Sequence, residues 1–119
     1  MQRVGVDIIE ISRIDGALKR FGPRFLQRVY TQSEIALCKE RPQVLAVRFA
    51  GKEAVMKALG TGVKGISWRE IEIVAKPTGE PLVRLYGKAK TRAGILGLSE
   101  FSISLSHSRE YAVATVVAG

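Results

Sequence analysis

Small residues at a four-residue spacing constrain the fold of this chain more than any other feature. They are Ala46, Ala50, Ala54 and Ala58. Positions four apart lie on one face of an α-helix, and Pro42 and Gly60 are residues that favour the first turn of a helix and the position after its end. The sequence therefore predicts a helix over residues 42–60 whose small-residue face lies close to a sheet.

The charged residues of this segment fall on two other parts of the helix surface. Arg48 and Lys52 are like charges four residues apart, which is unfavourable unless an anion lies between them. Glu53 and Lys57, at the border of the small-residue face, have the favourable order of a helical ion pair. One interpretation is an ordinary solvated ion pair. The other is that Glu53 binds a magnesium ion, which prefers carboxylate oxygens, and that Lys57 binds a phosphate group beside it.

The start of the chain supplies a candidate for a second carboxylate ligand. Val4, Val6 and Ile8 alternate with other residues, which predicts a β-strand. We expect these apolar side chains to face the core. Asp7 would then lie on the opposite face, where Gly5 leaves it room. Asp7 is either an ordinary carboxylate at a strand end or the partner of the helical carboxylate in a metal site.

The following segments predict short helices. Ser12 as N-cap and Gly22 as stop delimit the first helix, and Pro23 begins another helical turn. Thr31 and Glu34 have the spacing of a capping box, which opens a further helix to about residue 40.

The second half of the chain is mostly β. Residues 67–74 and 82–86 alternate apolar and polar side chains around a turn, 87–98 form a helix weakened by glycines, and 101–108 with 111–119 form a second hairpin. We therefore expect one domain over residues 1–119, of the α+β class, with a mainly antiparallel sheet and helices packed on one side.

Composition limits the partners of the chain. The net charge of +8 indicates an anionic partner. Aromatic residues make up 7% and do not alternate with basic residues, which argues against nucleic acid. No apolar run reaches the ~20 residues of a membrane span, and the first residues do not form a signal peptide, so we expect a cytoplasmic protein without a membrane partner. The single cysteine, Cys38, predicts a structural thiol rather than a disulfide.

Three segments together carry a resemblance to a known family. They are GVDIIEISRI at 5–14, RFAGKEAVMKALGTG at 48–62 and SLSHSREYAVA at 104–114. In this order, and across essentially the entire chain, they resemble the small bacterial 4′-phosphopantetheinyl transferases, the holo-[acyl-carrier-protein] synthase family. The resemblance implies a 4′-phosphopantetheinyl transferase-like fold and a homotrimer that binds coenzyme A in clefts between subunits.

The resemblance also implies an activity. The family transfers 4′-phosphopantetheine from coenzyme A to a serine of apo acyl carrier protein, releasing adenosine 3′,5′-bisphosphate, in fatty acid biosynthesis. It implies a Mg²⁺ ion, with Mn²⁺ as an alternative, held by Asp7, Glu53 and the diphosphate of coenzyme A. Since a serine alcohol is a poor acid, a carboxylate base is needed, and Glu53 is the candidate, acting directly or through a water.

The remaining site residues follow from the resemblance, except Thr78 and Gly79, which are assigned because the turn that contains them could approach the nucleotide. Lys57 would place a cation at the phosphates, next to Glu53. The residues assigned to coenzyme A are Arg48, Lys57, His107, Thr78 and Gly79. Those assigned to the acidic carrier protein are Arg13, Arg20, Arg24 and Arg28, in the first helical region. A surface arginine at position 48, an exposed structural histidine at 107 and a merely solvated basic helix are the alternatives.

Two other functions compete with this one. A nucleic-acid-binding domain would use the same positive charge but would leave Asp7 and Glu53 without a role. A non-catalytic subunit would keep the fold alone, and the intact Asp7, Glu53, Lys57 and His107 argue against it.

Overall fold

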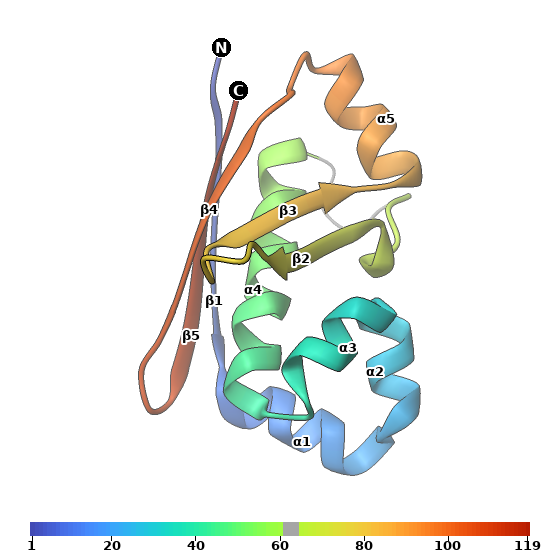
Figure 1. Ribbon diagram of the computed structural model, residues 1–119, viewed down its shortest axis with the longest axis vertical. Helices are drawn as coiled ribbons and strands as arrows, with labels where there is room; N and C mark the ends of the chain where they lie inside the picture. Colours follow the sequence, from blue (N-terminus) through green and yellow to red (C-terminus); the bar gives the residue numbers. More distant parts are fainter. Residues whose placement is uncertain (61–64) are drawn as a thin grey trace.

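One long helix lies between two antiparallel sheets. In the computed structural model, which describes residues 1–60 and 65–119, helix α4 (Pro42–Leu59) runs along one face of a three-stranded sheet, and a two-stranded sheet crosses its other side (Figure 1). The larger sheet has the order β1-β5-β4, with β1 Arg3–Glu10, β5 Tyr111–Ala118 and β4 Phe101–His107. The smaller sheet pairs β2 (Ile71–Ala75) with β3 (Pro81–Leu85). Thr61 and Gly62, which end the predicted motif 48–62, lie outside the described residues.

The other helices cover the two ends of α4. Three short helices follow β1 and surround the start of α4: α1 Ile11–Phe21, α2 Pro23–Val29 and α3 Gln32–Cys38. Helix α5 (Gly87–Ile95) lies near its end, and a 3₁₀ turn, η1 (Trp68–Glu70), precedes β2. All helices lie on one side of the larger sheet (Figure 1), which confirms the predicted α+β class.

Local signals placed most helix ends correctly. Thr31 and Glu34 form the predicted capping box, and Gly60 ends α4 with φ 73°. The N-cap prediction at Ser12 is wrong, because α1 begins at Ile11, directly after β1. The backbone N–H of Ile11 donates to the carbonyl of Glu110 at 2.8 Å, so the neighbouring hairpin fixes the start of this helix.

The predicted orientation of β1 is wrong. Val4, Val6 and Ile8 point away from α4 and are 63%, 53% and 63% exposed. Gly5 is buried against the helix, and Asp7 lies on the same face. The reason is close approach: a Cβ on Gly5 would overlap the carbonyl oxygen of Ala54 and lie 3.1 Å from the nitrogen of Ala58.

The small-residue face of α4 is the centre of the core, as predicted. Ala50, Ala54, Val55 and Ala58 are at most 1% exposed, and Gly51 is buried where a Cβ would meet Ile73 of β2 and Ile103 of β4. Because these side chains are small, the backbone of α4 approaches the backbone of β1 closely at Gly5. Cys38 belongs to a second cluster under α1–α3, where burial raises the pKa of its thiol to about 11, in agreement with a structural role.

Replacing the glycine at the closest contact tests this packing. We expect Gly5→Ala to lower the free energy of unfolding by about 3 kcal/mol, because neither backbone can move aside without breaking the sheet or the helix. Gly16→Ala is the matched control: a Cβ there meets nothing within 4 Å. It should raise the free energy of unfolding by about 0.5–1 kcal/mol through helix propensity. Urea unfolding measures both, and a tolerated Gly5→Ala would contradict the close approach.

Candidate functional site

The contact between β1 and α4 gathers three charged side chains. Asp7 projects from β1 toward the helix, and its side chain is 18% exposed. The ammonium of Lys57 lies 3.1 Å from Oδ1 of Asp7 and donates to the carbonyl of Val6 at 2.9 Å. Lys57 thereby joins the last turn of α4 to the edge of the sheet, and its side chain remains 53% exposed.

Glu53 completes this cluster one helical turn before Lys57. Burial raises the pKa of Glu53, the negative charge of Asp7 raises it further, and the ammonium of Lys57 opposes both. The two carboxylates are therefore close enough to repel each other. The helical pair predicted between Glu53 and Lys57 is not among the ion pairs of residues 1–60 and 65–119, where Lys57 pairs with Asp7 instead.

The donor set of the cluster fits a divalent ion with oxygen ligands. Glu53 and Asp7 offer two carboxylates whose repulsion a cation would relieve. In the part of the chain that the structure describes, no group of three or more His, Cys, Asp or Glu could hold a metal ion. A closed structural zinc site requires such a group, whereas Mg²⁺ is held by one or two carboxylates, with waters and phosphates as further ligands.

The opposite side of α4 carries the other two charges. Lys52 is fully buried, and its ammonium lies 2.7 Å from Oε1 of Glu34 on α3. Glu34 thus supplies an anion for Lys52, one of the two like charges. Arg48 is 8% exposed and donates from Nε to the carbonyl of Ile73 at 3.1 Å. The sequence predicts only the capping-box role of Glu34 and not this contact, because nothing local links α3 with α4.

The other residues assigned to coenzyme A lie apart from the cluster. His107 is exposed at the end of β4, and its Nδ1 lies 3.1 Å from the carbonyl oxygen of Ser108. It pairs with Ala112, whereas Asp7 pairs with Ala114, so His107 lies two strands across from β1 and two residues further along. Thr78 and Gly79 are exposed in the turn between β2 and β3.

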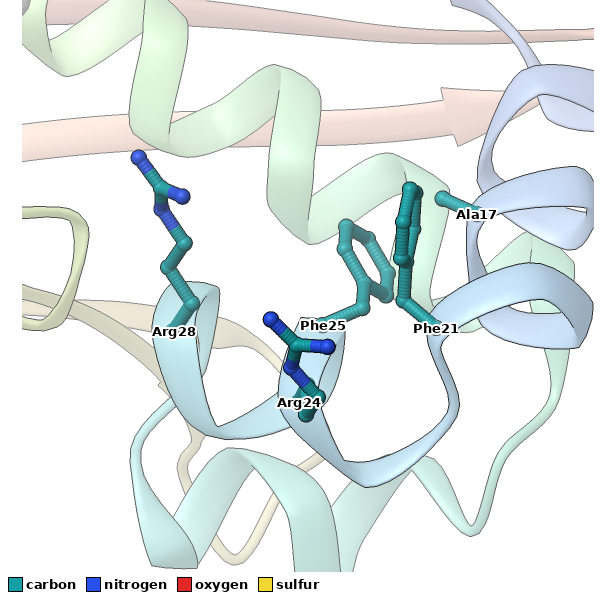
Figure 2. A pocket seen from close by; sticks show the side chains of 5 residues that line it. All are labelled: Ala17, Phe21, Arg24, Phe25 and Arg28. Atoms are coloured by element: carbon teal, nitrogen blue, oxygen red, sulfur yellow. The ribbon is translucent and has the colours of Figure 1, made fainter.

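The predicted basic region forms a pocket between α1 and α2. Figure 2 shows two phenylalanine rings next to Ala17, with the guanidinium groups of two arginines beside them. The cavity measures about 320 Å³ and is lined by Ala17, Phe21, Arg24, Phe25 and Arg28. Arg13 and Arg20 are also exposed on α1. The arginines were predicted from the sequence, but the aromatic rings of Phe21 and Phe25 were not. Their spacing of four residues across the break at Gly22 was the available signal.

Comparison with known proteins gives concordant results. The profile of the 4′-phosphopantetheinyl transferase superfamily matches residues 3–116. A holo-[acyl-carrier-protein] synthase of Dehalococcoides mccartyi is 53% identical over 118 residues, 99% of this chain and 98% of that protein. That of Herpetosiphon aurantiacus is 50% identical over 120 residues, 95% of this chain and 94% of that protein.

Solved structures agree with these relatives. The Helicobacter pylori holo-[acyl-carrier-protein] synthase in complex with coenzyme A superposes with a TM-score of 0.89 at 38% identity, covering 98% of this chain and 99% of that one. The Neisseria meningitidis enzyme gives 0.87 at 36% identity, covering 98% and 97%.

The charges of the cluster predict the titration of Glu53. In the metal-free protein, Asp7→Asn should lower the pKa of Glu53, because it removes a neighbouring negative charge. Lys57→Met should raise it, because it removes the compensating cation. Carbon-13 NMR of the glutamate carboxyl carbons against pH measures both shifts. Opposite signs, or no response to either substitution, would show that the three groups are not neighbours.

Proposed function

Because this chain belongs to the 4′-phosphopantetheinyl transferase superfamily, we propose that it transfers 4′-phosphopantetheine from coenzyme A to a serine of apo acyl carrier protein. Adenosine 3′,5′-bisphosphate is the second product. The observation that carries the proposal is the cluster of Asp7, Glu53 and Lys57, in a chain whose relatives are named holo-[acyl-carrier-protein] synthases. Residues 1–119 act as one transferase domain.

The reaction requires little covalent chemistry from the protein. The serine oxygen attacks the β-phosphorus of coenzyme A, a new O–P bond forms, and the bond to the bridging oxygen breaks, which leaves the negative charge on the bisphosphate. Glu53 accepts the serine proton, directly or through a water. Asp7 and Glu53 would hold Mg²⁺, or Mn²⁺, which when bound would supply charge neutralisation at the diphosphate.

Lys57 binds the phosphates beside this pair of carboxylates. Its ammonium is anchored by Asp7 and by the carbonyl of Val6. Because the side chain is 53% exposed, a bound phosphate can reach it from the solvent side. A fixed cation stabilises the negative charge that spreads over the transferring group, which is the main task in phosphoryl transfer.

Coenzyme A lies between subunits of a homotrimer. Arg48, His107, Thr78 and Gly79 contribute to its binding, although in one chain His107 is two strands away from Asp7. A cleft shared by two copies can bring together residues that one copy keeps apart. The exposed apolar strip of Val4, Val6 and Ile8 on β1 supports assembly through the bare face of the sheet, since soluble chains seldom leave such a strip uncovered.

The carrier protein docks on α1 and α2. The pocket combines the rings of Phe21 and Phe25 with Arg24 and Arg28, and Arg13 and Arg20 extend its positive charge. This combination fits an apolar side chain that projects from an acidic helix, the surface expected of an acyl carrier protein. Complementary charge increases the rate of encounter and fixes orientation.

We place the reaction in the cytoplasm, in fatty acid biosynthesis, without a nucleic-acid or membrane partner. Within residues 1–60 and 65–119, no helix is both long and apolar enough to cross a membrane.

A transfer assay tests the proposal. Incubation with apo carrier protein, coenzyme A and Mg²⁺ should add one phosphopantetheine to the carrier, as measured by mass spectrometry. Asp7→Asn and Glu53→Gln should each lower kcat by about 100-fold or more, because each removes a ligand and Glu53→Gln also removes the base. Glu100→Gln changes an exposed carboxylate outside the cluster and should leave the rate unchanged. An unmodified carrier with the wild-type protein would refute the activity, and full activity of either cluster variant would refute its assigned role.

Charge reversal tests the docking surface separately. Arg24→Glu and Arg28→Glu should each raise the KM for carrier protein about 10-fold and leave the KM for coenzyme A unchanged. The KM for carrier protein of the wild type should also rise with ionic strength, because salt screens exposed charges. Lys88→Glu, on the exposed side of α5, is the control. Equal effects of all three substitutions would show that only net charge matters and that the pocket is not the docking site.

A further inference from the structure

A buried ion pair lies about a quarter turn around α4 from Glu53 of the proposed site. The side chains of Lys52 and Glu34 are both 0% exposed and lie 2.7 Å apart. Among the ion pairs of the described residues, it is the only one with both side chains fully buried. Lys52 directly precedes Glu53, so the two side chains leave the helix about 100° apart.

The ammonium of Lys52 is held from three directions. It donates to Oε1 of Glu34, to the carbonyl of Trp68 at 3.1 Å and to the carbonyl of Ile71. An ammonium has three protons, so these acceptors use all of them.

Glu34 is fixed equally well. Its Oε1 also accepts from the backbone N–H of Thr31 at 2.9 Å, and its Oε2 accepts from the N–H of Ile73 at 2.8 Å. Through this pair, α4 is tied to α3, η1 and β2 at one point.

Two simpler roles do not account for the pair. Lys52 cannot contact a phosphate or a serine, because none of its side chain reaches the surface. Stability alone is also a weak reason to bury two charges, since well-packed apolar residues usually stabilise a core at least as well. A pair with fixed geometry can instead specify one arrangement of the elements that it joins.

The arrangement in question is the rotation of α4 about its own axis. Against β1 the helix presents Ala54, Ala58 and the backbone, which allow a short distance but give few side chains that interlock. A rotation of about 20° would move a side-chain end that lies ~6 Å from the helix axis by about 2 Å. Functional groups need to be held within ~0.5 Å, so such a rotation would separate Glu53 from Asp7.

We propose that Lys52 is a positioning residue that, together with Glu34, fixes the rotation of α4 so that Glu53 and Lys57 face Asp7. This inference rests on the proposed function, in which Asp7 and Glu53 share a divalent ion. The two lysines of the motif at 48–62 then have distinct tasks: Lys57 contacts the substrate, and Lys52 acts through Glu53.

The test separates positioning from stability. Lys52→Met removes the ammonium and leaves the carboxylate of Glu34 buried without its partner, which should destabilise the fold. The double variant Lys52→Met/Glu34→Gln also removes that buried charge while keeping an acceptor for the capping box, so it should recover much of the lost stability. Val55→Ala, at another fully buried position of α4, is a destabilised control that keeps the ion pair.

Mn²⁺ affinity, measured from the EPR signal of the unbound ion, is the main readout, and kcat for carrier modification is the second. At a temperature where urea unfolding shows each protein to be folded, the double variant should bind Mn²⁺ 10–100-fold more weakly and lose a similar factor in kcat, the usual effect of removing support behind a metal ligand. The KM for carrier protein should stay near the wild-type value. Val55→Ala should match the wild type in both readouts.

A double variant with wild-type Mn²⁺ affinity and kcat would overturn the positioning role, even if Lys52→Met alone failed to fold. Equal Mn²⁺ affinity and equal kcat of Lys52→Met and Val55→Ala, compared at matched free energy of unfolding, would also overturn the positioning role. Wild-type protein that neither binds Mn²⁺ nor modifies the carrier would instead refute the proposed function, so the two failures are distinguishable.

Discussion

The contact between the backbone of β1 and the small-residue face of α4 is the constraint on which the rest of the structure depends. Gly5 has no room for a Cβ against Ala54, so the strand and helix approach as closely as their backbones allow. A more distant strand would move Asp7 away from Lys57, whose ammonium bridges the gap. The row of alanines is therefore a condition for the charged cluster rather than only a feature of the core.

Charge on α4 is divided between two environments with different tasks. Lys52 faces inward, where Glu34 and backbone carbonyls satisfy it completely. Glu53 and Lys57 face the strand, where two carboxylates and one exposed ammonium leave the local charge unbalanced. In our proposal, the balanced side orients the helix, and the unbalanced side binds a divalent ion and an anionic substrate. Part of the net charge of +8 comes from the arginines around the α1–α2 pocket, where we propose that the carrier protein docks.

Features set by neighbouring residues could be predicted from the sequence, and those set by packing could not. The capping box of Thr31 and Glu34 and the end of α4 at Gly60 depend on local hydrogen bonds and backbone conformation, and both predictions are confirmed. Strand alternation separates the two faces of β1 but does not say which one meets the helix, so the orientation of Val4, Val6 and Ile8 was wrong. The favourable helical spacing of Glu53 and Lys57 gave the wrong ion pair, because a carboxylate 50 residues away lies closer to the ammonium. The family was recognisable from three short segments, and its profile matches residues 3–116.

The central claim is that β1 and α4 approach closely enough for Asp7 and Glu53 to hold one divalent ion. Anomalous diffraction at the manganese absorption edge, from crystals grown with Mn²⁺ and coenzyme A, tests it most directly. The account predicts one peak in each site, within about 2.5 Å of a carboxylate oxygen of both residues. A peak bound by only one of them, or located elsewhere on the protein, would contradict it.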